Sequence, residues 1–340
     1  KGRVLMRAHI RSGLHFAVVA TASLLLLAAC KTGSDPAQAE REDLTPSTLA
    51  QASDDLVDLG SGLDTTLMPV ASSSGAYLAA QAAIMERDMA AASDYLLVAL
   101  ASDPDNKDLL RQTHFALVSS GRIPEALPIA RKLMIGEGID QFSPLTLAAD
   151  ALDRDVFDDA EAALIRLPIN GYNTILVPLL EAWVAAAKGD FDDAMAAIGP
   201  TDAGDGFDAL RAYHIGLIED LAGRADAAEV AFERSMAGQV GGAYRVVLAY
   251  GAFLERQGKI DAAREVYSSF LATNPDSLWL DATLARLDAG GAPPEQIDEA
   301  REGASEALFA VASSAQQNDG PEVGLAYGQL AAYLVPQNDV

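Results

Sequence analysis

Residues whose chemistry could support catalysis or covalent modification are few in this chain of 340 residues. The sequence holds one cysteine, Cys30, and four histidines, of which two lie within the first fifteen residues. A single cysteine excludes a disulfide framework and a cysteine-rich zinc site. His114 and His214 have no partner at metal-ligand spacing, and no phosphate-binding loop, HExxH or GxSxG motif is present. We therefore expect no catalytic residue, no metal and no other cofactor.

Adjacent acids recur as Asp158-Asp159 and Asp192-Asp193, and paired carboxylates can perform acid–base chemistry. Both pairs fall where a helix is expected to begin, and there a negative charge interacts favourably with the helix dipole by about 0.3–1 kcal/mol. We interpret them as helix-stabilising. The whole chain carries 24 basic and 49 acidic residues, a formal net charge of −25 at pH 7. Such a surface cannot displace counterions from phosphates, so nucleic acid is not an expected partner, and no small-molecule substrate is evident.

The first 29 residues differ in character from the rest. They contain Lys1, Arg3, Arg7 and Arg11 but no acid, and the stretch 14–29 has no formally charged side chain. A basic start followed by a short apolar run predicts an export signal. A spanning helix requires about 20 apolar residues, and this run is shorter. Met6 is a plausible true start of translation.

The apolar run ends in Leu27-Ala28-Ala29-Cys30, which resembles the lipobox of bacterial lipoproteins. The resemblance implies cleavage before Cys30, acylation of its thiol and membrane attachment through the lipid. The alternative is an ordinary signal peptide or an uncleaved anchor, with Cys30 incidental. In such lipoproteins an Asp after the cysteine favours the inner membrane, so Lys31 favours a periplasm-facing anchor in the outer membrane. Residues 30–72, rich in small and polar side chains, are predicted to form a flexible tether.

Beyond the tether an alanine recurs at intervals of 34, 34, 34, 34 and 35 residues: Ala92, Ala126, Ala160, Ala194, Ala228 and Ala263. Twelve residues before each stands a small residue or its substitute: Ala80, His114, Ala148, Ala182, Gly216 and Gly251. Glycine precedes the alanine by five residues in four copies: Gly121, Gly189, Gly223 and Gly258. Small residues allow two helices to cross closely, and glycine tolerates a turn of positive φ. The pattern predicts six helix pairs over 73–276.

This pattern closely resembles that of tetratricopeptide (TPR) repeats, and with the lipobox it resembles a bacterial TPR lipoprotein. The resemblance implies an all-α solenoid of antiparallel helix pairs. Pro104 and Pro275 are expected to mark the ends of second helices. In 277–340 the register loosens. We expect a degenerate repeat, with helices at 278–289 and 295–303, and then a further pair at 305–317 and 321–334. No polar capping helix follows, so we expect the chain to continue beyond Val340.

In proteins of this family, fixed positions of each first helix line a concave groove. The resemblance assigns eight residues of this chain to the partner-binding groove: Tyr77, Phe115, Phe142, Leu145, Leu179, Trp183, Tyr213 and Leu217. An apolar groove suits an amphipathic helix or an extended hydrophobic segment. The Lys, Arg and Asn pattern of family members that clamp a carboxylate is absent. Alternatively, packing against neighbouring repeats or the tether buries these side chains.

The resemblance therefore implies a lipid-anchored periplasmic scaffold, which is not an enzyme and which binds a protein or peptide client through its concave groove. Assembly of envelope or secretion complexes is the expected setting. The alternative is an enzymatic or complex-subunit activity in a region beyond Val340. A composition change or a cluster of His, Asp and Glu in that region would favour it.

Overall fold

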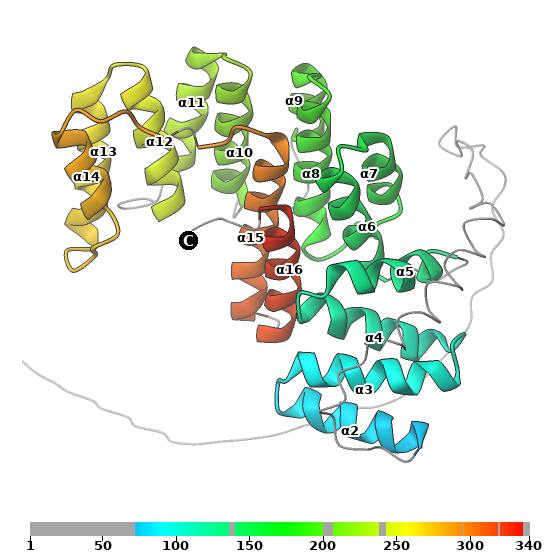
Figure 1. Ribbon diagram of the computed structural model, residues 1–340. Coiled ribbons are helices and arrows are strands. Elements are labelled where there is room, and N and C mark those ends of the chain that lie inside the picture. The colour runs from blue at the N-terminus through cyan, green and yellow to red at the C-terminus, as the bar shows by residue number, and fades with distance from the viewer. Residues whose placement is uncertain are drawn as a thin grey trace, which may run out of the picture. The chain divides into compact units, whose positions relative to one another are not determined.

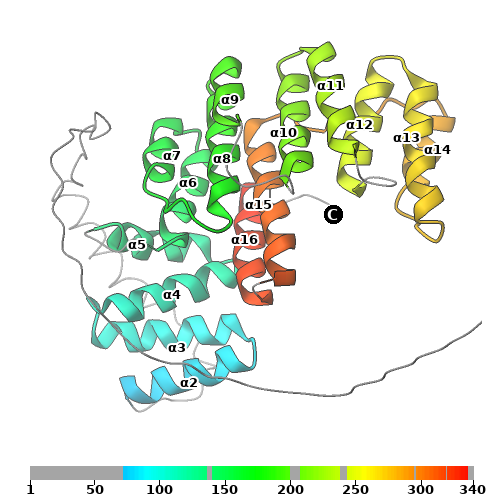
Figure 2. The same cartoon turned by 180° about the vertical axis from the view of Figure 1, so that it is seen from behind.

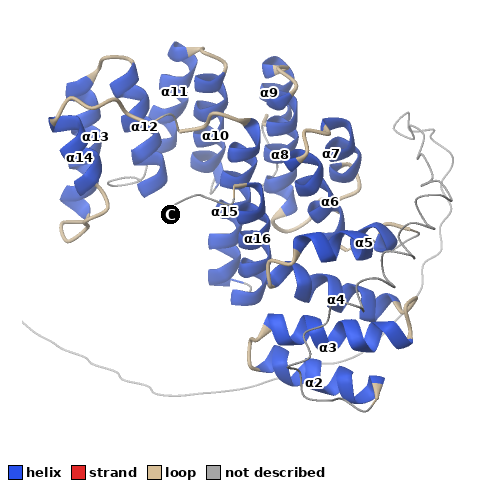
Figure 3. Ribbon diagram, viewed as in Figure 1, coloured by secondary structure: helices blue, strands red, loops and turns tan. Residues whose placement is uncertain are grey.

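Each 34-residue unit folds into two helices joined by a tight turn. The computed structural model describes residues 72–135, 140–199, 207–237, 243–294, 296–318 and 320–335, and all regular structure in these residues is helical (Figure 3). The six pairs are α2 (Ser73–Met85) with α3 (Met89–Ser102), α4 (Lys107–Ser119) with α5 (Ile123–Leu133), α6 (Phe142–Asp153) with α7 (Phe157–Leu164), α8 (Asn173–Ala187) with α9 (Phe191–Ala197), α10 (Asp208–Leu221) with α11 (Ala225–Met236), and α12 (Tyr244–Arg256) with α13 (Ile260–Thr273). The predicted all-α solenoid is confirmed.

The recurring alanines lie where the helices of a pair cross. All six are completely buried, each on the second helix of its pair. The glycines at the small-residue positions are needed for the same reason. A Cβ at Gly216 would lie 2.8 Å from the Phe232 ring, and a Cβ at Gly251 would overlap the Tyr267 ring. Any larger residue at these positions would force the two helices apart.

The turn between the helices of each pair requires one residue of left-handed conformation. Gly121, Gly189, Gly223 and Gly258 adopt φ values of 76°, 83°, 71° and 74°, as the sequence pattern predicts. Arg87 and Asp155 occupy the same place in their repeats, with φ of 62° and 57°. These two side chains therefore adopt a backbone conformation that favours glycine and costs about 1–2 kcal/mol for other residues.

Ion pairs connect successive repeats on the surface. Asp158 and Asp192 lie in the first turns of α7 and α9, as expected. Asp158 also pairs with Lys188 of the next repeat at 2.8 Å, and Asp192 pairs with Arg224 at the same distance. The hydrogen bond from Lys188 lowers the pKa of the Asp158 carboxyl. Exposed pairs of this kind are weak, so they add little to packing between the repeats.

The last helices leave the repeat pattern. They are α14 (Asp281–Asp288), α15 (Ala300–Asn318) and α16 (Pro321–Leu334). The predicted helix at 295–303 is wrong: the described residues between α14 and α15 contain no helix, and residues 300–303 form the first turn of α15. Glu302 accepts hydrogen bonds from the backbone N–H groups of Asp298 and Glu299, and this capping arrangement starts the helix at Ala300. The predicted final pair is confirmed, with α15 starting five residues earlier than expected.

The α15–α16 pair packs against α4, α6, α8 and α10 instead of stacking beyond α14 (Figures 1 and 2). These four helices are the first helices of the second, third, fourth and fifth repeats. The segment between Asp288 and Ala300 is long enough for the chain to turn back. The end of the chain therefore contacts the middle of its own array.

The predicted signal sequence 1–29, Cys30 and nearly all of the tether 30–72 lie outside the described residues, as does the end of the chain from residue 336. Among the helices that the structure describes, none has both the length and the apolar character needed to cross a membrane.

Candidate functional site

The predicted groove residues lie on the first helices of five successive repeats. Tyr77 is on α2, Phe115 on α4, and the others are on α6, α8 and α10. Two of the eight, Tyr77 and Phe115, are partly buried. The remaining six are buried: Phe142, Leu145, Leu179, Trp183, Tyr213 and Leu217. A client could therefore reach few of these side chains in this conformation. Their role in binding a client stays a prediction.

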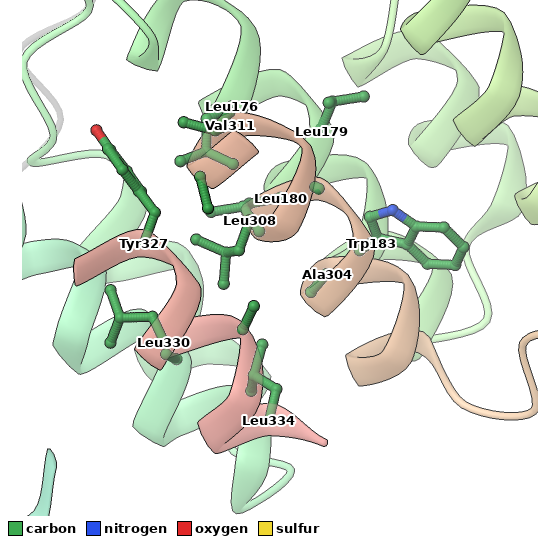
Figure 4. Packing of buried hydrophobic residues seen from close by; sticks show 14 of the residues in the cluster. Leu176, Leu179, Leu180, Trp183, Ala304, Leu308, Val311, Tyr327, Leu330 and Leu334 are labelled. Carbon is green, nitrogen blue, oxygen red and sulfur yellow. The ribbon is translucent and has the colours of Figure 1, made fainter. Parts of the chain in front are cut away.

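The side chains that cover the groove come from the C-terminal pair. Ala304, Leu308 and Val311 of α15 lie against the apolar side chains of α8, and Tyr327 and Leu330 of α16 continue the same cluster (Figure 4). The Tyr327 ring centroid lies 5.1 Å from that of Phe142. The alternative expectation of self-burial therefore describes the centre of the groove. The covering segment is the C-terminal pair, whereas neighbouring repeats or the tether were expected from the sequence.

Trp183 lies at the centre of this contact and is completely buried. Its indole Nε1 donates a hydrogen bond to Nδ1 of His214 at 3.0 Å. Above the indole lies Gly303 of α15, where a Cβ would overlap the six-membered ring. Gly303 therefore allows α15 to approach α8 over the largest side chain of the groove.

Both histidines of the repeat region are buried, and each has one ring nitrogen without a hydrogen-bond partner. Since His214 Nδ1 accepts from Trp183, its Nε2 carries the proton in the neutral ring and remains unpaired. Burial lowers the pKa of His214 to about 3. Burial also lowers the pKa of His114 to about 4, although the Asp140 carboxylate opposes this shift. The two rings are therefore neutral, buried structural groups.

One charged group of the groove also contacts the C-terminal pair. Arg245 of α12 forms a two-pronged ion pair with Glu306 of α15, in which its Nε donates to Oε2 at 2.8 Å. The Tyr213 hydroxyl donates to the same oxygen at 3.4 Å. The Glu306 side chain is only 5% exposed. Burial, followed by the charge of Glu306, raises the pKa of Tyr213 well above its ordinary value.

The repeat pattern does not identify Glu306 as a residue of the groove. The only signal for Glu306 is its position beside the apolar stripe of α15, between the buried Ala304 and Leu308. Such a position predicts burial, although it does not name a partner 61 residues away. Detecting this pair from sequence would require related sequences in which the charges at positions 245 and 306 vary together.

No arrangement of described side chains suggests catalysis. Among these residues, no three His, Cys, Asp or Glu side chains gather closely enough to hold a metal ion. The acid pairs of α7 and α9 lie in first turns, where helix stabilisation and the ion pairs described above account for them. The candidate functional site is therefore the groove, together with the α15–α16 pair that lies in it.

Comparison with known proteins identifies the repeat. The family model described as the tetratricopeptide repeat matches residues 245–287, which include all of α13 and most of α12 and α14. This segment is a tetratricopeptide repeat. A search of curated proteins gave no significant match. Among solved structures, the chain is similar to the TPR domain of P58(IPK), at 14% identity over 86% of this chain and 95% of that chain, with a TM-score of 0.25.

TPR arrays bind protein partners in general, and the TPR fold is typically a non-catalytic scaffold. The other five units share two elements of the matched unit, a turn of positive φ and a buried alanine on the second helix. Four of them also have a small residue on the first helix, and the second repeat has His114 there. The six units therefore share the helix-pair architecture of the matched repeat.

Proposed function

We propose that this TPR protein is a lipid-anchored scaffold of the bacterial cell envelope, which faces the periplasm and binds a protein client. The observation that carries the proposal is the coincidence of the chain's one cysteine with the end of a lipobox-like run, followed by a TPR array. The anchor is a lipid because the strongly acidic surface would be repelled by anionic headgroups. The outer membrane is favoured because Lys31, and not Asp, follows Cys30.

The anchor is tested by palmitate labelling in a bacterial host, with mass spectrometry of the mature N-terminus. The wild type should incorporate label and begin at Cys30, and Cys30→Ala should incorporate none. A matched control, Cys30→Ala with Ser34→Cys, keeps one cysteine outside the lipobox and should also remain unlabelled. Label in either variant, or an unprocessed wild-type N-terminus, would refute lipidation at Cys30. Density-gradient separation of the two membranes then tests the outer-membrane location.

The client is proposed to bind the concave side, with assembly of envelope or secretion complexes as its setting. Tyr77 is the predicted groove residue farthest along the array from α10, and it is only partly buried. A photo-crosslinking amino acid at position 77 should capture a protein in intact cells. The same group at position 230, where Val230 of α11 is exposed, provides the control for random encounters. Equal capture at both positions would contradict binding on the concave side.

A further inference from the structure

We propose that the α15–α16 pair occupies the client's place in the groove, and that a client helix presenting a small residue and a carboxylate binds by displacing it. This inference rests on the proposed function in one respect, namely that the groove takes a client. The contacts of the docked pair therefore indicate which chemical properties a client helix needs in order to replace it.

The first property is a small residue facing the indole of Trp183. Gly303 occupies this place, and a Cβ there would overlap the ring. Around it, α15 presents alanines and medium-sized aliphatic residues to α8, and α16 presents the Tyr327 ring to Phe142 at 5.1 Å and to Tyr172 at 6.3 Å. A helix with a bulky residue opposite Trp183 could not approach α8 as closely as α15 does.

The second property is a carboxylate one turn farther along the helix. Glu306 follows Gly303 by three residues, which is nearly one helical turn, and it receives two donors from Arg245 and one from Tyr213. The Arg245 guanidinium also lies 4.5 Å from the Phe309 ring centroid. Without α15, the groove would hold an unpaired arginine among apolar walls. Burying that charge requires an anion from the incoming helix, so the groove selects for an acidic amphipathic helix.

The contacts at the rim contribute less to this selection. Arg87 pairs with Glu322 at 3.3 Å, and Arg301 lies 3.8 Å from Asp153, both with substantial exposure. The Tyr333 hydroxyl donates to Asp150 at 3.2 Å. Exposed ion pairs of this geometry are weak and are screened by salt. They fix the orientation of the pair, whereas the centre of the groove provides the recognition.

The pair can leave as one unit. α15 and α16 pack along each other, the Ser305 hydroxyl donates to the Ala331 carbonyl at 2.9 Å, and Gly324 lets the two backbones approach closely. Only the non-helical segment before Ala300 connects the pair to the array within the described residues. Displacement therefore exchanges one helical surface for another, and the apolar groove is not left exposed to water. The covalent connection favours the resident pair, as a linked ligand has a local concentration in the millimolar range.

The experiment uses the full chain in a Trp279→Phe background, where Trp183 is the sole tryptophan because the sequence holds two. The probe is a fluorescent synthetic peptide of residues 300–335, and its Kd is measured by anisotropy. Glu306→Gln weakens the resident pair, since it replaces the carboxylate that faces Arg245. We expect this variant to bind the peptide at least 10-fold more tightly than the wild type does. Glu229→Gln is the matched control, because Glu229 pairs with Lys259 away from the groove, and it should bind as the wild type does.

A second peptide, identical except for Gln in place of Glu306, tests the carboxylate directly. It should bind the Glu306→Gln chain at least 10-fold more weakly than the first peptide does. If Glu306→Gln fails to fold by circular dichroism, Gly303→Ala replaces it, because the added Cβ overlaps Trp183 and loosens α15 without changing the charge. In that chain the acidic peptide should again bind at least 10-fold more tightly than in the wild type. Acrylamide quenching of Trp183 should increase in the loosened variant and return to the wild-type value when peptide is added.

Three results would overturn the inference: no peptide binding by a folded loosened variant, equal binding of the two peptides, or a dimer that protects Trp183 and excludes peptide. The last would assign the groove to a second copy of the chain. Failure of the proposed function is distinguishable from these results. If the peptide exchanges but no protein is captured at position 77, the proposed envelope client is refuted, whereas the proposed recognition of a small residue and a carboxylate by the groove stands. Capture at position 77 without peptide exchange keeps a client on the concave side at the first repeat and refutes displacement of the α15–α16 pair.

Discussion

Replacing Gly251 by alanine tests the close helix crossing in the sixth repeat, at a site where two effects oppose each other. Alanine is about 1 kcal/mol better than glycine in a helix interior, so propensity alone predicts a more stable protein. The structure predicts the opposite, because the new Cβ would overlap the Tyr267 ring. Overpacking of this kind costs about 1–3 kcal/mol. Moving the ring also strains the hydrogen bond from the Tyr267 hydroxyl to Glu255, 2.7 Å long and worth about 1.5–3 kcal/mol.

Taken together, these terms predict that Gly251→Ala lowers the free energy of unfolding by about 2 kcal/mol. Gly328→Ala is the matched control, since it also lies in a helix and its Cβ would meet only Ala312 at 3.9 Å. That variant should gain up to about 1 kcal/mol. Urea denaturation followed by circular dichroism measures both changes, and native-state hydrogen exchange should locate the loss of protection in α12 and α13.

A double-mutant cycle identifies the cause. In a Tyr267→Leu background the ring is absent, so Gly251→Ala should become neutral or stabilising. The crossing explanation is refuted if Gly251→Ala is as stable as Gly328→Ala, or if its cost is unchanged in the Tyr267→Leu background.

Three further changes have outcomes fixed by the structure. Positions 155 and 189 both require positive φ, so Asp155→Gly should stabilise the protein by about 0.5–1 kcal/mol and Gly189→Ala should destabilise it by about 1–2 kcal/mol. Urea denaturation measures both changes. Effects of the opposite sign would contradict the requirement for positive φ in the shared turn. His214 and His114 have lowered pKa values, so below pH 6.5 the unfolded chain binds protons that the folded chain does not, and the free energy of unfolding falls as pH decreases. The urea midpoint should therefore drop between pH 7 and pH 5, and the drop should be smaller in His214→Phe; an equal drop would exclude His214 as a cause. Ala160→Leu should cost about 1–3 kcal/mol by overpacking, with hydrogen-exchange protection lost in α6, α7 and the adjoining α16; wild-type protection would mean that no crossing lies there.

The repeats could be predicted from sequence because their determinants are local and recur. Contacts within one helix pair determine a buried alanine such as Ala160 and a turn glycine such as Gly189. The same pattern therefore recurs along the repeats. Arg87 and Asp155 show the limit of this reasoning. They adopt the glycine conformation without being glycine, since packing of the two helices fixes the turn and overrides the residue's preference.

The return of α15–α16 into the groove could not be predicted in the same way. The apolar stripe of α15 indicates that one face is buried, but it does not say against which surface. The ion pair of Glu306 with Arg245 spans 61 positions, and the contact of Tyr333 with Asp150 spans 183. Neither pair recurs elsewhere in the chain, so periodicity contains no information about it. Six of the eight predicted groove residues belong to one buried cluster, and the segment that covers them lay outside the pattern.

The docked pair also changes how the array should fold and unfold. An open solenoid behaves as a row of units in which each responds only to its neighbours, so it can lose repeats one by one from either end. Here α15 and α16 touch first helices of four repeats at once, so the second to the fifth repeats unfold as one cooperative block. The first repeat and the α13–α14 end remain free to fray. Forming the block requires closure of a loop that brings Tyr333 to Asp150, and long-range closure is slow. We therefore expect the repeats to form first from local contacts and the groove to close in a later, slower step.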